Sequence, residues 1–303
     1  MSEPIDYATP ALLNERRELL CRMGALATLS VVSGSTVLTA CGGGGGSGAQ
    51  AVSAAGAVPV VGAGPAPAGP APAPPPAVVG PAPPPAPVPA APALGAHALA
   101  FNFEGESSAS LSTPGVRTGS TGSTLLVCVG RGVVSSVLPT DSAGNVFAQL
   151  GVARTYTLWP ASGTALFACE KARGMDGYSV SIAKPKLSDE TTLTVVEITG
   201  GGLVRDAQWR EVLSPQPLTS ATVTTSGPAL LVAWWWGDAG VNDNKTAVPN
   251  NGFTVIDSVL QSGGLVQCAV AVRQVGVAGT YNVTWAATPQ QGAQLWLVAV
   301  QAP

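Results

Sequence analysis

Histidine and charged residues are the scarcest features of this 303-residue sequence. It contains a single histidine, His97, and only 10% of its residues are Asp, Glu, Lys or Arg. One histidine removes most of the usual routes to general-base catalysis and to histidine-rich metal sites. The net charge is −3 and no basic run occurs. This excludes nucleic acid as a partner, because affinity for phosphate backbones comes mostly from clustered Lys and Arg.

Motifs of common enzyme active sites are also missing. The sequence has no Gly-x-Ser-x-Gly elbow, no phosphate-binding glycine loop and no metal triad. Two carboxylate pairs of the kind that glycosidases use remain, Glu104 with Glu106 and Asp189 with Glu190. Adjacent residues on a strand point in opposite directions, and carboxylates near strand ends are usually solvated. We therefore expect no enzyme activity; a jelly-roll polysaccharide hydrolase or lyase is an alternative.

The N-terminal 41 residues have the layout of a secretory signal. Arg16 and Arg17 precede an uncharged stretch, residues 24–40, which is too short and too interrupted by Ser and Gly to span a bilayer comfortably. It ends in Leu38-Thr39-Ala40-Cys41, which resembles a lipobox. The resemblance implies cleavage after residue 40 and a diacylglycerol on the Cys41 thiol. The alternative is an ordinary buried thiol at Cys41.

Two details of this segment concern the route and the destination of export. The run Arg16-Arg17-Glu18-Leu19-Leu20 resembles the signal of the twin-arginine translocation route, which moves folded proteins. The general secretory route is the alternative. Residue 42 is Gly rather than the Asp that favours inner-membrane retention in Gram-negative bacteria. The resemblance therefore implies an anchor in the outer membrane, on its periplasmic or its surface side.

Residues 41–94 are predicted to be a linker without a fold. Five glycines follow Cys41, and the rest is almost entirely Ala, Pro, Gly and Val. Proline fixes φ and donates no backbone hydrogen bond, so this segment cannot form a helix or a sheet interior. Either an extended spacer with a reach on the order of 100 Å or a flexible coil is expected. Both hold the remaining chain away from the membrane.

Residues 95–303 are predicted to form an all-β domain. Short runs rich in Val, Ile, Thr and aromatic residues alternate with clusters of turn residues, and no window sustains a helical period. The predicted strands span residues 98–103, 124–130, 146–156, 164–172, 178–183, 191–199, 219–225, 229–236, 253–261, 265–275, 280–286 and 294–301. Many short strands at this spacing indicate an antiparallel β-sandwich, such as a jelly roll, or a barrel.

The domain contains an internal sequence repeat, in which residues of about 122–200 resemble residues 227–301. Residues 122–127 match 227–232, 145–147 match 251–253, 166–169 match 265–268, 177–180 match 280–283, and 193–196 match 295–298. The order is kept, which predicts two similar five-strand halves. The alternative is that β domains of this composition look alike. The sequence leaves open whether the halves form one sandwich or two.

Residues 100–301 also resemble bacterial extracellular β-sandwich domains of the Ig-like or jelly-roll kind. The likeness rests on a Ser-Thr-Leu-Leu-Val strand, residues 123–127, that leads into an Asp-x-x-Gly-Asn-x-Phe turn, residues 141–147, and on the final strand, residues 295–300. Such domains occur in surface and secreted proteins as binding or spacer modules. The resemblance implies a role outside the cell and no particular ligand.

The segment Trp234-Trp235-Trp236-Gly237-Asp238 is the candidate ligand-binding site. Consecutive strand residues point to alternating faces, so three tryptophans cannot all enter one core. An exposed tryptophan, with Asp238 beside it, would suit the apolar face of a sugar ring or a peptide. The alternative is that the 237–252 loop covers the second face.

That loop is also a candidate calcium site. Carboxylate and amide oxygens occur at intervals that could hold the ion, on Asp238, Asn242, Asp243 and Asn244. The 12-residue ligand spacing of an EF-hand is absent. A polar surface loop is the alternative. No other cofactor is expected.

Three cysteines remain beyond Cys41: Cys128, Cys169 and Cys268, each inside an apolar strand. Core filling by free thiols is one interpretation, and one disulfide formed in an oxidising compartment is another.

Together these patterns predict a lipid-anchored surface protein. It would display a β-sandwich binding or adhesion module, with a polysaccharide or another envelope or surface protein as partner. A structural envelope protein without a small ligand is the alternative.

Overall fold

The computed structural model describes residue 69 and residues 91–302, apart from residues 104, 120, 214–215, 239–245, 261–263 and 289–291. The signal, Cys41 and nearly all of the linker lie outside these described residues. Every helix or strand element that the structure describes is a strand, and the strand pairs are antiparallel. The prediction of an all-β, antiparallel sandwich is confirmed.

The chain forms two successive sets of strands, which we call the first and second halves of the domain. The first half comprises β1 (Ala93–Asn102), β2 (Ser110–Ser112), β3 (Thr121–Arg131), β4 (Thr140–Asp141), β5 (Ala148–Gln149), β6 (Arg154–Thr155), β7 (Gly163–Arg173), β8 (Val180–Ala183) and β9 (Thr191–Thr199). The second half comprises β10 (Leu203–Val212), β11 (Leu218–Thr219), β12 (Val223–Thr225), β13 (Ala229–Asp238), β14 (Val248–Pro249), β15 (Thr254–Val259), β16 (Val266–Val275), β17 (Gly279–Tyr281), β18 (Thr284–Ala286) and β19 (Ala293–Gln301).

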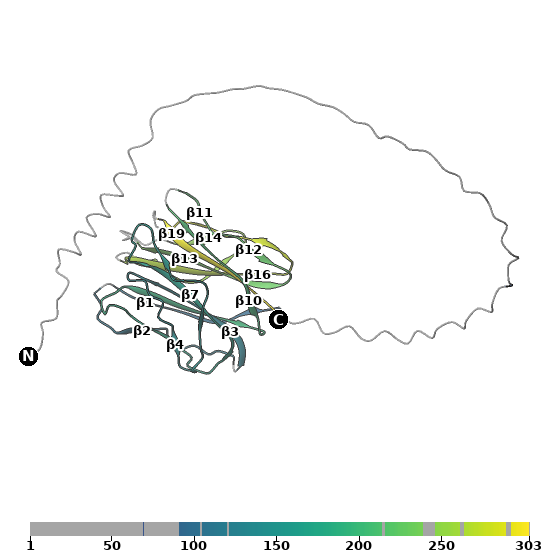
Figure 1. Ribbon diagram of the computed structural model, residues 1–303, viewed down its shortest axis with the longest axis horizontal. Helices are drawn as coiled ribbons and strands as arrows, with labels where there is room; N and C mark the ends of the chain where they lie inside the picture. Colours follow the sequence, from purple (N-terminus) through teal and green to yellow (C-terminus); the bar gives the residue numbers. More distant parts are fainter. Residues whose placement is uncertain are drawn as a thin grey trace, which may run out of the picture. The chain divides into compact units, whose positions relative to one another are not determined.

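Two large sheets, one from each half, pack face to face in the middle of the domain (Figure 1). Their strand orders are β1-β9-β3-β7-β5, with β6 also paired to β7, and β10-β19-β13-β16-β15. The core between them contains aliphatic side chains of both sheets together with Trp234, Trp236 and Trp296. Small sheets cover the outer faces: β2-β8-β4 on the first half, and β11-β18-β14 with the β12-β17 pair on the second. The domain is thus four layers deep, with three cores.

The strand order of the second half repeats that of the first. β10 takes the place of β1, β19 of β9, β13 of β3, β16 of β7, and β15 of β5. The pairing repeats as well: Val127 pairs with Phe167, and Ala233, in the equivalent place, pairs with Ala271. The match of residues 122–127 with 227–232 is off by one residue here. It aligned Val127, which faces an outer core, with Val232, which faces the central core.

Several strands differ from the prediction, three of them in ways that bear on the fold. β1 spans Ala93–Asn102, so it begins five residues before the predicted strand 98–103 and two residues before the predicted domain boundary at residue 95. The predicted strand 146–156 is divided into β5 and β6, and Gly151 between them has a φ of 74°, which turns the chain. β10 was not predicted. Its charged residues resemble a loop, but it is an edge strand whose apolar residues, including Trp209, face the central core.

Candidate functional site

The three consecutive tryptophans are all buried. Trp234 and Trp236 point into the central core, and Trp235 points into the outer core of the second half. None is more than 1% exposed. The hypothesis that they form an exposed platform for a sugar ring or a peptide is therefore wrong, because both faces of β13 are covered.

The second face of β13 is covered mainly by the small sheets. Trp235 belongs to a core cluster with Leu218 of β11, Trp285 of β18 and Phe253. A central strand in a four-layer domain has no solvent face, so it tolerates large apolar residues at every position. The Trp234 indole N–H also donates a hydrogen bond of 2.9 Å to the Thr194 hydroxyl, which joins the two halves.

The predicted calcium site lies almost wholly outside the described residues. Asn242, Asp243 and Asn244 fall in the segment 239–245, and only the backbone of Asp238, at the end of β13, is described. Glu104 is also outside. Among the residues that the structure describes, no three His, Cys, Asp or Glu side chains are grouped to hold a metal ion. The calcium site stays a prediction.

The three domain cysteines are free and buried. Cys128 and Cys268 lie in the central core, and Cys169 lies in the outer core of the first half. Of the two interpretations that the sequence left open, the structure agrees with the first: the cysteines are free thiols that fill the cores. Burial raises the pKa of the Cys128 thiol, and burial likewise raises the pKa of Cys268.

We expect Cys128 and Cys268 to resist alkylation while the protein is folded. An ordinary thiol gains thiolate as the pH rises toward roughly 8.5, and the thiolate is the nucleophile. A raised pKa keeps both thiols protonated, so a rise from about pH 7 to about pH 9 should not speed their labelling. Mass spectrometry after iodoacetamide treatment of the Cys41→Ser chain measures this, with a urea-unfolded sample as control. Rapid labelling of either cysteine in the folded protein would contradict the burial.

The carboxylates of Asp189 and Glu190 bind backbone groups. Both Glu190 oxygens accept from the Leu265 N–H of the second half, at 3.0 and 2.9 Å. Asp189 accepts from the Val133 N–H at 3.2 Å. Burial lowers the pKa of the neighbouring Arg131 to about 10, and the negative charge of Asp189 opposes that shift. These carboxylates therefore fix loops and connect the halves.

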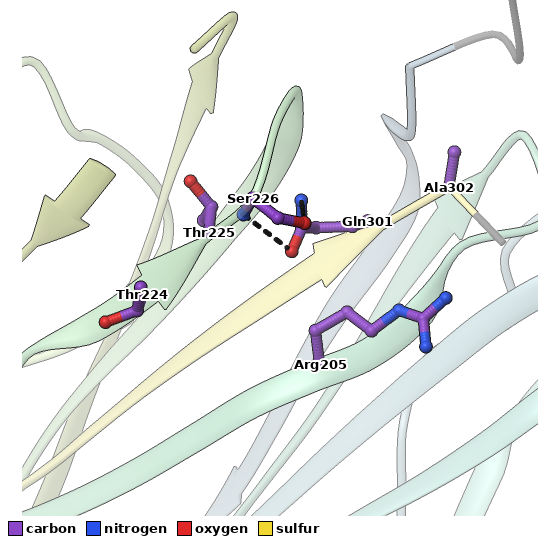
Figure 2. Close-up of a pocket in the computed structure, with 6 residues that line it drawn as sticks. All are labelled: Arg205, Thr224, Thr225, Ser226, Gln301 and Ala302. Carbon is purple, nitrogen blue, oxygen red and sulfur yellow. Dashed lines mark hydrogen bonds between the residues drawn. The ribbon is translucent and has the colours of Figure 1, made fainter. Parts of the chain in front are cut away.

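A shallow groove of about 450 Å³ opens on the second half (Figure 2). It lies near the entry of the linker, since Gly202 at the start of β10 is close to both Pro92 and Gln301. The lining residues are polar except for one alanine: Arg205, Thr224, Thr225, Ser226, Gln301 and Ala302. Figure 2 shows that β19, which carries Gln301, runs between the segment with Arg205 and the segment with the three hydroxyl residues.

Two hydrogen bonds fix the walls of this groove. The Thr224 N–H donates to the Asp206 carboxylate at 2.9 Å, and the Ser226 N–H donates to the side-chain amide oxygen of Gln301 at 3.3 Å. Arg205 is exposed and forms no ion pair with any residue that the structure describes. The groove is therefore lined by a guanidinium group on β10 and, across β19, by three hydroxyl residues (Figure 2).

Sequence reasoning missed the groove because it missed β10. In residues 203–212, small or apolar residues that face the central core alternate with exposed polar ones at 205, 208 and 210. That alternation, typical of an edge strand with one solvent face, was the available signal. The meeting of β10, β12 and β19 depends on topology, which no short motif encodes.

No family model, no curated protein and no solved structure matches the chain. The part of the chain that the structure describes contains no helix long and apolar enough to cross a membrane.

Proposed function

We propose that this chain is an exported lipoprotein, anchored in the outer membrane through Cys41, whose β domain is displayed as a binding module. The observation that carries the proposal is the succession of Leu38-Thr39-Ala40-Cys41, a Gly- and Pro/Ala-rich linker, and a β domain whose first strand begins at Ala93. A lipid, a spacer and a folded domain in this order hold the domain at a distance from a bilayer.

The position of the groove supports a ligand-binding role. Pro92, where the linker ends, lies at the start of β10 and close to Gln301. β1 then runs about 30 Å away from this point, at roughly 3.3 Å per residue over its ten residues. The groove thus lies close to the point where the chain enters the domain. We propose that an extended ligand such as a polysaccharide binds there.

A structural envelope protein is the second candidate, and an exposed apolar group favours it. Phe103, Val137, Leu138 and Leu187 are 37–53% exposed, on three loops at the end of the domain opposite the groove. Two of these loops are joined by a hydrogen bond of 3.2 Å from the Ser108 N–H to the Leu187 carbonyl. Exposed apolar groups of this kind mark contacts with other proteins.

Replacing Cys41 by alanine should abolish lipid attachment. Radiolabelled palmitate should be incorporated into the native chain and not into the Cys41→Ala chain, which should leave the membrane fraction because its thiol acceptor is gone. Cys21→Ser is the matched control, since residue 21 precedes the predicted cleavage point and should not affect labelling. Membrane-bound, labelled protein from the Cys41→Ala chain would refute the proposal.

A further inference from the structure

Four loops of the first half meet at the end of the domain opposite the linker. β1 runs from Ala93, where the linker ends, to Asn102, which pairs with Thr191 of β9. Arg131 at the end of β3 also pairs with Thr191, and on its other side with Gly163 of β7. The loops that follow β1 and β3 and those that precede β7 and β9 therefore lie at the same end. We call this end the tip, and its loops are residues 103–109, 132–139, 156–162 and 184–190.

Hydrogen bonds join the loops of the tip to one another. The Ser108 N–H donates to the Leu187 carbonyl at 3.2 Å, which links the first loop to the fourth. The Val134 N–H donates to the Ala161 carbonyl at 2.7 Å, which links the second loop to the third. A bond of 3.2 Å to the Asp189 carboxylate links the second loop to the fourth. The tip is therefore one preformed surface rather than four independent loops.

Apolar side chains are concentrated on the tip. The described residues expose ten large apolar side chains, and five of these belong to the four loops of the tip. These five are 37–53% exposed: Phe103, Val137, Leu138, Leu158 and Leu187. Trp159, next to Leu158, is half-buried against the central core. Apolar groups gathered in this way mark a surface that contacts a membrane or another protein.

The tip carries little charge. Two of its loops, residues 132–139 and 156–162, contain no Asp, Glu, Lys or Arg. Among the described residues of the other two loops, the exposed charged side chains are Glu106 and Lys186. Few charges would therefore have to leave water if the apolar side chains entered a bilayer. Lys186 precedes Leu187, and a lysine beside an apolar residue suits the boundary between acyl chains and phosphate headgroups.

The linker is long enough to bring the tip to the membrane that would hold the Cys41 lipid. About 50 residues separate Cys41 from β1, and a coil of this length spans roughly 40 Å on average. The ten residues of β1 place the tip about 30 Å from the point where the linker enters. A tether favours a second contact most when its mean span matches the distance to be bridged. The two lengths match, so the domain can turn over and bring its tip to the bilayer.

We propose that the tip binds the lipid bilayer in which Cys41 is anchored, with Val137, Leu138 and Leu187 inserted between the headgroups. This inference rests on the proposed lipid anchor. The apolar side chains lie on separate loops, which suits a fluid surface that needs no matching shape better than it suits a protein partner. Docking of the tip turns the groove away from the bilayer. It holds the groove about 30 Å above the membrane, where an extended ligand can reach it.

Quenching of a fluorescent probe by spin-labelled lipid tests this inference in the lipidated chain. Val137→Cys carries the probe on the tip, and Val277→Cys is the matched control, since Val277 is 68% exposed in the loop after β16, at the linker end. The chain without either substitution gives the background labelling, because its domain cysteines are buried. In vesicles of phosphatidylethanolamine and phosphatidylglycerol, the Val137→Cys probe should lose about half of its emission or more, and the Val277→Cys probe should be unaffected.

Charge introduced on the tip should abolish the quenching. Leu138→Asp and Leu187→Asp, added together to the Val137→Cys chain, should restore the full emission, because burying carboxylates in a bilayer is costly. Both residues are about half exposed, at 49% and 53%, so the fold should be kept, which circular dichroism checks. Quenching that persists in this variant would overturn the inference.

The remaining outcomes separate failure of the tip from failure of the anchor. A chain that floats with the vesicles while its Val137→Cys probe is not quenched keeps the lipid anchor and refutes docking of the tip. A probe that is shielded from aqueous iodide and is not quenched by lipid shows that a protein, such as a second copy, covers the tip, and this also refutes the inference. A chain that neither floats nor incorporates palmitate refutes the proposed anchor itself, and the inference with it.

Discussion

Replacing Trp234 by alanine should lower the free energy of unfolding by about 3–5 kcal/mol, the range for a large aromatic removed from a packed core. The side chain is fully buried between the two large sheets, and its indole N–H bonds to Thr194 of the other half. Its loss leaves a cavity in the core that both halves share. Urea unfolding of the Cys41→Ser chain, followed by tryptophan fluorescence and circular dichroism, measures the change.

The matched control is Val146→Ala, since Val146 is 84% exposed and should change stability by no more than about 0.5 kcal/mol. A Trp234→Ala chain as stable as the native one would show that β13 does not lie in the core. The same outcome combined with lost ligand binding would restore the tryptophans as a binding platform. We expect neither.

Replacing Glu197 by alanine should cost about 3 kcal/mol of stability. The three groups that donate to this carboxylate lie on β1, β3 and the segment before β3, and the substitution leaves them without an acceptor. Each buried donor without a partner costs about 1–3 kcal/mol, offset in part by no longer burying the carboxylate. Thermal unfolding gives the change, with Glu106→Ala, an exposed carboxylate, as control.

Glu197→Gln distinguishes the charge from the shape of this side chain. The glutamine amide keeps one acceptor oxygen, so at most two of the three donors lose their partner. The loss in the free energy of unfolding should therefore lie between zero and the loss caused by Glu197→Ala. If the Glu197→Ala chain unfolds at the same temperature as the native chain, the carboxylate does not stabilise the irregular part of β1 between Leu94 and His97.

The sequence predicted well what depends on local pattern. Thr191–Thr199 was predicted residue for residue, because β-branched and apolar residues end at Gly200, which has a φ of 88°. The alternation rule also correctly placed Trp235 on the face opposite Trp234. Part of the cover on that face comes from the 237–252 loop, which contains Ala247 and β14, and the rest comes from strands of only two or three residues, which are too short to show an alternation pattern.

The groove depends on contacts between strands that are distant from one another in the sequence. Arg205, Ser226 and Gln301 are widely separated in the sequence and meet only because β19 inserts between β10 and β13. No spacing rule links them. The repeat was visible in the sequence, but the match of residues 122–127 with 227–232 was off by one residue. It therefore aligned side chains that point to opposite faces of their sheets. The match of residues 193–196 with 295–298, by contrast, has the offset that aligns Glu197 with Ala299, and the register of the paired strands agrees with it.

The position of β19 has a consequence for biosynthesis. All nine of its residues are buried, and it fills the gap between β10 and β13, although it follows all the other described strands along the chain. Until β19 has been synthesised, the second large sheet is split and one side of β13 is unpaired. A nascent chain in this condition exposes unpaired strand edges, which favour aggregation.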